Sequence, residues 1–420
     1  METTYRVKVW KTAVYRGTKV TTYTVRWTLD GEEFRAPFGT SALADSQWHR
    51  TAGNSRKNTA KALTAATVAF LRAQPSAFRL VDVRTALREY AFNARRRDEA
   101  PPEVAVILKW VKRNTLSMAT WEDPVKVDDV LRAVDTLLNS KRAAASFIKC
   151  NRRILNVAME HAVKRKILRT NPLPKGRGAT PKTSNAVDCR SLIHPQRMAR
   201  ILARIRRRTR GGRRLHAYFS TLYYTGPRPE EAVAMYVDDV TLPPKDAEDQ
   251  WCDVLFHTAQ PEVGKNWTDD GRIHEQRGLK GRAEDDTRLV PGPPALTRIL
   301  RERIKAEGLI PGDRLFQGEF GGIRILAGSV TRRAWGTARK AELTERERES
   351  PMGRRIYDIR HTRLTKWLND GFPPAQVAYW AGNSVPVLLS FYAGCIEGQL
   401  PDLKRRMEAQ GDLPELAEGE

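Results

Sequence analysis

The sequence is poor in cysteine and contains no long apolar stretch. Its 420 residues include only four cysteines, with no Cys-x-x-Cys pair: Cys150, Cys189, Cys252 and Cys395. This scatter argues against a zinc site and against a disulfide framework, so we expect free thiols and a cytoplasmic protein. No apolar run approaches the ~20 residues of a membrane span, and the first residues lack the apolar core of a signal peptide, so we expect no membrane association.

Two further absences concern ligands. The sequence has no Gly-x-x-x-x-Gly-Lys-Ser/Thr loop of the kind that holds nucleotide phosphates. Its histidines and carboxylates show no metal-ligand spacing. We therefore expect no cofactor, neither a nucleotide nor a metal.

Negative charge is scarce relative to positive charge. The chain has 73 Lys and Arg against 49 Asp and Glu, which gives a net charge of +24. A balance this positive favours a polyanionic partner, of which nucleic acid is the commonest. Charge alone does not separate DNA from RNA.

Hydrophobic periodicity predicts a mainly helical α+β chain. Apolar and polar residues alternate over residues 5–38, and Asp30-Gly31 is a hairpin signal, so a small β-ribbon is expected there. Residues 46–172 carry apolar side chains at helical spacing, and a Pro- and Gly-rich basic segment follows them. We expect four regions: a β-rich region at 1–45, a helical domain at 46–175, a linker at 176–187 and a second domain at 188–420.

The second domain carries the sequence pattern that is most specific. Residues 225–231 read T-G-P-R-P-E-E, residues 357–362 read Y-D-I-R-H-T, and residues 381–384 read A-G-N-S. A tyrosine, Tyr392, follows the last box. Two permanently charged arginines, an amide and a late tyrosine suit the attack of a phenol on a phosphodiester, because a guanidinium binds two phosphate oxygens at once.

These boxes, in this order, resemble those of the tyrosine recombinases, the phage-type integrases. The segment around Tyr392 is most similar to integrases of actinobacterial mobile elements. The resemblance implies that Arg228 and Arg360 stabilise the phosphate and that Tyr392 is the nucleophile. It also implies a supporting position for Glu231 behind Arg228, and a packing and hydrogen-bonding position for His361.

Two positions depart from the family pattern. Tyr357 stands where a histidine is usual, and its phenol can still hydrogen-bond a phosphate oxygen. Asn383 stands where a histidine or tryptophan is usual, and an amide can donate a hydrogen bond but cannot carry a proton. The general acid of the family is a lysine ahead of an Arg-x-Val-Pro strand, which favours Lys280 over its rival Lys265.

The resemblance also implies an architecture and partners. We expect a small N-terminal β-ribbon, a helical core-binding (SAM-like) domain and a mixed α/β catalytic domain that form a C-shaped clamp on double-stranded DNA. The family acts as homotetramers, with accessory directionality factors, and the segment 398–410 is the candidate for docking on a neighbour. The region 1–45 is expected to be a shortened arm-type DNA-binding module or a capping hairpin.

Basic residues predict the DNA contacts. Seven arginines crowd positions 204–214, and Arg152 and Arg153 stand among other basic residues of the helical region. The candidates for phosphate contacts are Arg206, Arg207, Arg208, Arg210, Arg213, Arg214, Arg152 and Arg153.

The expected function is site-specific DNA recombination through a covalent 3′-phosphotyrosyl intermediate, without ATP or metal. Three alternatives stay open. Asn383 and the short N-terminal region would suit an impaired integrase that only binds DNA. A DNA-relaxing topoisomerase would use the same chemistry, and an RNA-binding protein would have the same charge.

Overall fold

The computed structural model divides the chain into two compact units. Unit 1 comprises Met1–Thr183 together with Val263–Ile273, and unit 2 comprises Ser184–Glu262 and His274–Glu420. The structure describes in full residues 48, 50–176, 180–246, 250–281, 283, 285–318, 324–395 and 404–405. Before residue 48 it describes the backbone of five strands. The segment 398–410, predicted to dock on a neighbour, therefore lies outside the described residues except for 404–405.

Short antiparallel strands form the N-terminal region. They are β1 (Val7–Val9), β2 (Ala13–Arg16), β3 (Thr21–Thr24), β4 (Trp27–Leu29) and β5 (Glu32–Glu33). β2 pairs with β3, and β1, β4 and β5 form a second small sheet. The predicted ribbon is confirmed, and Leu29 pairs with Glu32. The hairpin signal at residues 30–31 lies outside the described residues.

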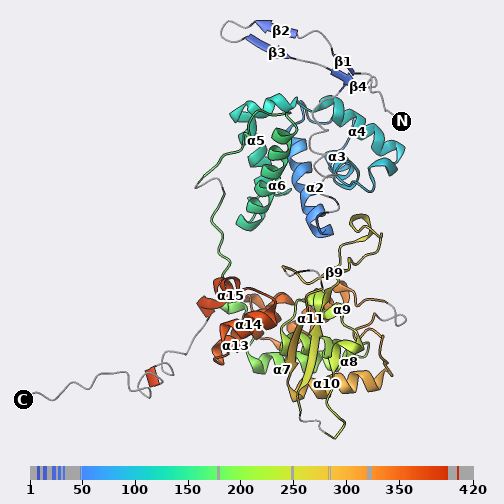
Figure 1. Ribbon diagram of the computed structural model, residues 1–420, viewed down its shortest axis with the longest axis vertical. Coiled ribbons are helices and arrows are strands. Elements are labelled where there is room, and N and C mark those ends of the chain that lie inside the picture. Colours follow the sequence, from blue (N-terminus) through green and yellow to red (C-terminus); the bar gives the residue numbers. More distant parts are fainter. Residues whose placement is uncertain are drawn as a thin grey trace, which may run out of the picture. The chain divides into compact units, whose positions relative to one another are not determined.

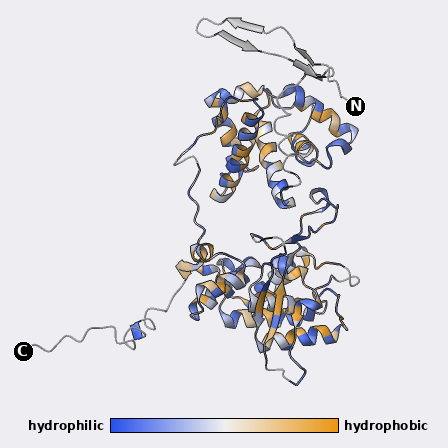
Figure 2. Ribbon diagram, viewed as in Figure 1, coloured by the Kyte–Doolittle hydropathy of each residue, from blue (hydrophilic) through white to orange (hydrophobic). Residues whose placement is uncertain are grey.

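Helices build the rest of unit 1, as the periodicity predicted. They are α2 (Gly53–Ala69), α3 (Leu80–Ala86) with a π-helical turn η1 (Leu87–Ala91), η2 (Arg97–Glu99), α4 (Pro102–Asn114), η3 (Met118–Glu122), α5 (Pro124–Asp135) and α6 (Ala145–Lys164). α5 and α6 pack side by side (Figure 1), and both also pack against α2. Blue and orange residues mix along these helices in Figure 2, as expected of amphipathic helices around one core. None of the described helices is long and apolar enough to cross a bilayer.

Residues 263–273 leave unit 2 and complete the core of unit 1. Trp267 is 4 % exposed and lies 6.1 Å from the ring of Trp48. Arg56 donates to the carbonyl of Trp267 at 3.0 Å and forms an ion pair with Asp269. Val263 and Trp267 are therefore core residues of unit 1, although polar residues surround them in the sequence.

Unit 2 contains a three-stranded antiparallel sheet with the strand order β10-β7-β6. The strands are β6 (Val240–Thr241), β7 (Cys252–Phe256) and β10 (Arg288–Gly292), with a second pair, β8 (Thr258–Ala259) and β9 (Arg277–Gly278). Buried and less buried residues alternate along β7 and β10. Hydrophobic residues colour these strands orange in Figure 2, and Val254 and Val290, which pair in the ladder, are fully buried.

Helices cover this sheet and carry the boxes identified in the sequence. They are α7 (Pro195–Arg206), α8 (Gly212–Thr225), α9 (Pro229–Ala234), α10 (Pro294–Ala306), α11 (Gly328–Glu342), α12 (Glu345–Glu349), α13 (Tyr357–Asn369), α14 (Pro374–Ala381) and α15 (Val385–Tyr392). Short turns are η4 (Cys189–Ser191), η5 (Val237–Asp239) and η7 (Ala393–Cys395) in unit 2, and η6 (Lys265–Trp267) in unit 1. α8, α10 and α14 pack against β10, so the mainly helical mixed architecture is confirmed.

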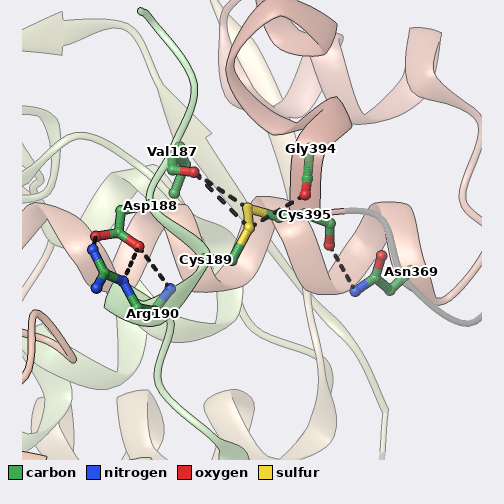
Figure 3. The surroundings of a disulfide bond; sticks show 7 residues. All are labelled: Val187, Asp188, Cys189, Arg190, Asn369, Gly394 and Cys395. Carbon is green, nitrogen blue, oxygen red and sulfur yellow. Dashed lines mark hydrogen bonds and ion pairs between the residues drawn. A yellow bond between two sulfur atoms is a disulfide. The ribbon is translucent and has the colours of Figure 1, made fainter.

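A disulfide joins the start of unit 2 to the segment after α15. Cys189 and Cys395 are bonded, with their Cα atoms 5.5 Å apart, although 206 positions separate them (Figure 3). The backbone N–H of Val187 donates to the carbonyl of Phe391 at 2.8 Å beside this bond. The expectation that all cysteines are free is therefore wrong for this pair and holds for Cys150 and Cys252.

We expect reduction of this disulfide to lower the free energy of unfolding of unit 2 by about 2–5 kcal/mol, because the bond closes a long loop and restricts the unfolded chain. Denaturant unfolding of the full chain with and without a dithiol reductant measures the difference. Cys395→Ser should reproduce the loss without reductant, and Cys150→Ser is the matched control. Equal midpoints for the oxidised and reduced protein would contradict the expectation.

Candidate active site

Two glycine turns shape the site. Gly226 ends α8 and Gly382 ends α14, both in the left-handed conformation, with φ of 61° and 62°. A Cβ on Gly226 would lie 2.9 Å from Leu364, and one on Gly382 would lie 3.0 Å from a guanidinium nitrogen of Arg288. Both turns therefore need glycine, and both aim backbone carbonyls at arginines.

Arg360 bridges these two turns from α13. Its Nη1 donates to the carbonyl of Gly226 at 2.7 Å, and its Nη2 donates to the carbonyl of Ala381 at 2.6 Å. The residue is 2 % exposed. Arg360 thus connects the box that contains Arg228 with the box that contains Asn383, which the sequence alone could only place in order.

Arg228 lies beside it, immediately before α9. Its Nη2 donates to the carbonyl of Gly382 at 3.3 Å and to Oδ1 of Asn383 at 3.1 Å. Since the amide oxygen of Asn383 faces Arg228, its NH₂ group is directed away from the guanidinium and is available as a donor. Asn383 is half-buried, so that donor lies at the open side of the site.

A buried carboxylate holds two of the arginines. Glu231 accepts from Nη1 of Arg228 at 2.8 Å and from the backbone N–H of Arg228 at 2.7 Å. It also pairs with Arg288, which enters from β10 and is fully buried. The sequence analysis missed Arg288 as a site residue. The signal was its position two residues before the buried Val290, since alternate residues of a strand face the same side.

The net charge of the site depends on whether Glu231 is ionised. Burial by itself would raise the pKa of Glu231, but the guanidiniums of Arg288, Arg228 and Arg360 outweigh burial and hold the pKa at about 2. Glu231 is therefore ionised, and the three arginines together with this one carboxylate leave two positive charges. Such a site is suited to an anion.

Neutralising Glu231 should destabilise the protein. We expect Glu231→Gln to cost about 3–5 kcal/mol of unfolding free energy, because two buried guanidiniums would lose their counter-charge. Since the folded-state pKa is depressed, the stabilisation by Glu231 is present above about pH 4.5 and is lost as the pH falls toward 2. Chemical denaturation between pH 7 and pH 3 measures both effects, with Glu230→Gln as the control. A variant as stable as the wild type at pH 7 would contradict this expectation.

Tyr392 ends α15 and meets α13 at the same site. Its hydroxyl lies 2.9 Å from Nδ1 of His361, and its side chain is 2 % exposed. Burial raises its pKa above the usual value, while Arg360 and Arg228 act in the opposite direction. His361, which bonds this hydroxyl, directly follows Arg360, and Arg360 bonds the carbonyl that precedes the Gly382 turn contacted by Arg228. Arg228, Arg360 and Tyr392 are linked through these contacts. α13, α14 and α15 accordingly pack together (Figure 1).

Tyr357 and His361 line the same region from one face of α13. Their rings lie 5.0 Å apart edge to face, and the ring of His361 lies 5.6 Å from that of Tyr392. Tyr357 is half-buried and stands near enough to Arg228 to raise the pKa of that guanidinium, along with Glu231 and against the effect of burial. The structure therefore brings Tyr357 together with the other predicted residues.

The two candidate lysines belong to different units. Lys280 is exposed in the turn after β9 of unit 2, beside the buried Leu279. Lys265 is exposed in η6, which belongs to unit 1. Only Lys280 is thus carried by the unit that contains Arg228 and Tyr392.

The predicted DNA-binding arginines do not gather at this site. The run at 204–214 extends from the end of α7 to the first turn of α8, and Arg228 follows the other end of this 14-residue helix α8, about 20 Å away. Arg206 pairs with Glu302 at 2.9 Å and Arg213 lies 3.9 Å from the same carboxylate, while Arg214 is buried. Arg208 is half-buried, and the exposed arginines of the run are Arg204, Arg206, Arg207, Arg210 and Arg213.

The arginines predicted in the helical region lie on α6. Arg152 pairs with Asp135 and is half-buried, whereas Arg153 is exposed. Arg153 is consequently the better placed of the two for an intermolecular contact.

Comparison with known proteins gives matches in structure but not in sequence. No protein-family model matches this chain, and no curated protein matches it in sequence. The Tn1549 transposon integrase in complex with a circular intermediate DNA matches with a TM-score of 0.52 at 14 % identity, over 77 % of this chain and 99 % of that one. The same integrase with transposon right end DNA matches with a TM-score of 0.52 at 15 % identity, over 78 % and 99 %.

A second protein gives a similar match. The XerH site-specific recombinase, bound to its difH substrate in a pre-cleavage complex, has a TM-score of 0.50 at 13 % identity. The match covers 91 % of this chain and 99 % of that chain. At such low identity the likeness establishes a shared fold.

Proposed function

We propose that this chain, which has the fold of the tyrosine recombinases, is an integrase that breaks and rejoins double-stranded DNA at specific sites. The observation that carries the proposal is the meeting of Arg228, Arg360 and Tyr392 at one positively charged site. The structural neighbours were solved on DNA, which supports a duplex as the partner.

The proposed chemistry is transesterification. The oxygen of Tyr392 attacks phosphorus, a 3′-phosphotyrosyl bond forms, and the bond to the 5′ oxygen breaks. Arg228 and Arg360 stabilise the charge that develops on the nonbridging oxygens. The leaving 5′ oxygen takes a proton from the ammonium group of Lys280. Since the phosphodiester is exchanged and not hydrolysed, rejoining requires no ATP.

Asn383 and Tyr357 complete the phosphate site in this proposal. The free NH₂ of Asn383 donates one hydrogen bond to a nonbridging oxygen, with its orientation fixed by Arg228. The hydroxyl of Tyr357 provides a second neutral donor. Because Tyr392 is 2 % exposed, the phosphate reaches its hydroxyl only after a local movement of α15 or of the segment around Asn383.

Assembly and domain roles follow from the same proposal. Residues 46–175 would hold one face of the duplex and residues 188–420 the other, joined by the linker at 176–187, as a C-shaped clamp. Four copies would act on two duplexes in the cytoplasm, with direction set by an accessory factor. The exposed Arg153 belongs to the proposed DNA-contacting surface.

A suicide substrate tests the proposal. The substrates are duplexes tiled across the DNA that flanks the gene, and each carries a nick close to the candidate cut. After attack, the short strand with the 5′ hydroxyl dissociates. Rejoining is then impossible, and the covalent complex is trapped. We expect a protein–DNA adduct that survives denaturation and is removed by protease. Tight binding with no adduct on any duplex would instead identify a DNA-binding relative that has lost activity.

Lys280 should be required for cleavage only when the leaving group must be protonated. We expect Lys280→Ala to slow cleavage by about 10²–10⁴-fold. A substrate with sulfur at the bridging 5′ position should restore most of this rate, because a thiolate leaves without protonation. Lys265→Ala serves as the matched control and should cleave both substrates at the wild-type rate. An equal defect of Lys280→Ala on both substrates would contradict the assignment.

A further inference from the structure

Cleavage requires that the Tyr392 hydroxyl lose its proton, and most groups around that hydroxyl cannot accept one. Arg228 and Arg360 are permanently protonated, and the amide of Asn383 is not basic at any accessible pH. The hydroxyl of Tyr357 is a hydrogen-bonding group and not an effective base. The carboxylates of Glu231 and Asp358 are bonded to arginines and not to the phenol. The imidazole of His361 is therefore the acceptor within reach, 2.9 Å from the hydroxyl.

We propose that His361 is the general base that takes the proton of Tyr392, an inference that rests on the DNA cleavage proposed above. In the forward step the Tyr392 oxygen bonds to phosphorus, and its proton moves to Nδ1 of His361. The 5′ oxygen leaves with the proton of Lys280. In rejoining, the 5′ hydroxyl attacks phosphorus, His361 returns its proton to the tyrosine oxygen, and Lys280 regains its own.

The geometry of α13 supports this assignment. His361 follows Arg360 directly in α13, so the residue that would bind the phosphate also fixes the backbone position of His361. His361 lies one helical turn after Tyr357, and its ring stands between the rings of Tyr357 and Tyr392. The side chain is 8 % exposed, so bulk water is a poor competitor for the proton. The acceptor tautomer carries its proton on Nε2 and leaves the Nδ1 lone pair facing Tyr392.

The charges that face His361 keep it neutral before DNA binds. Burial lowers its pKa to about 4, the Asp358 carboxylate opposes this effect, and Arg355 and Arg360 add to it. A phosphate beside Arg360 would bring negative charge and shift the pKa of His361 upward, which strengthens the base when the substrate is in place. Tyr392 on α15 and Tyr357 on α13 are the other titratable groups that face the ring.

Single-turnover cleavage across pH 5–9 tests the proposal on the full-length protein. We expect the wild-type rate to rise with pH to a plateau, and we expect His361→Gln to slow cleavage by about 10²–10⁴-fold. Glutamine keeps a hydrogen-bonding side chain but cannot take a proton, so the inflection should disappear from its profile. The melting temperature and the duplex affinity of the variant are measured as controls. Values near those of the wild type exclude a folding defect.

Cleavage of the bridging-sulfur substrate distinguishes the proposed function of His361 as a base from that of Lys280 as the general acid. The defect of His361→Gln should persist on that substrate, because sulfur replaces the leaving group and not the nucleophile. The defect of Lys280→Ala should largely disappear. A His361→Gln rate within threefold of wild type, or an inflection of the wild-type profile that persists in the His361→Gln profile, would overturn the inference. If the wild type forms no adduct on any substrate, the proposed function fails instead.

Discussion

Replacement of Tyr392 by phenylalanine should abolish the covalent adduct while duplex binding persists. The substitution removes one oxygen, and no other hydroxyl group is hydrogen-bonded to His361 in the described part of the chain. We expect adduct formation to fall by at least ~10⁴-fold, the scale on which the loss of a nucleophile acts. Denaturing gels of the nicked duplex measure the adduct, and gel shifts measure binding.

Tyr379→Phe is the matched control for this variant. Tyr379 lies on α14, close in sequence to Tyr392, and its side chain is 44 % exposed. It should form adduct at the wild-type rate. If Tyr392→Phe retained adduct formation, the assignment of the nucleophile would be wrong.

Replacement of Arg360 should have the next largest effect. We expect Arg360→Ala to slow cleavage by about 10²–10³-fold, because one charged donor to the phosphate is lost. Arg360→Lys should rescue little, since one nitrogen cannot occupy both positions from which Nη1 and Nη2 donate to the carbonyls of Gly226 and Ala381. Cleavage rates in single-turnover conditions measure the effect.

Arg354→Ala is the control for charge alone. Arg354 is exposed just before α13 and should contribute nothing specific to cleavage. The Arg360 variants also leave buried carbonyls without a donor, so their unfolding must be measured alongside the rate. Equal losses for the Arg354 and Arg360 variants would show that net charge, and not the site, governs cleavage.

The main parts of the site could be predicted because they are encoded locally. The glycines at 226 and 382 sit where each helix must stop, and each box places its arginine or amide one or two residues away. The spacing of apolar residues alone is sufficient to indicate the strand at 288–292 and the helix at 294–306. What the sequence did not reveal was the contact between boxes, in which Arg360 bonds the carbonyls of Gly226 and Ala381.

Features that depend on distant pairing escaped sequence analysis. Cys189 and Cys395 carry no local signal for a bond across 206 positions. Trp267 resembles a residue of a polar loop until its contact with the sequence-distant Trp48 in the core of unit 1 is known. The arginine run at 204–214 precedes Arg228 closely in sequence, but the straight α8 separates the two in space. His361 was interpreted as a packing residue because its distance to Tyr392 depends on how α13 and α15 meet.

The most direct test of the central claim is to identify the residue that carries DNA after cleavage. The trapped adduct is digested with nuclease and protease, and the modified peptide is sequenced by mass spectrometry. The account predicts a 3′-phosphorylated nucleotide on the oxygen of Tyr392. A nucleotide on any other side chain, or a cleaved duplex with no nucleotide attached to the protein, would contradict it.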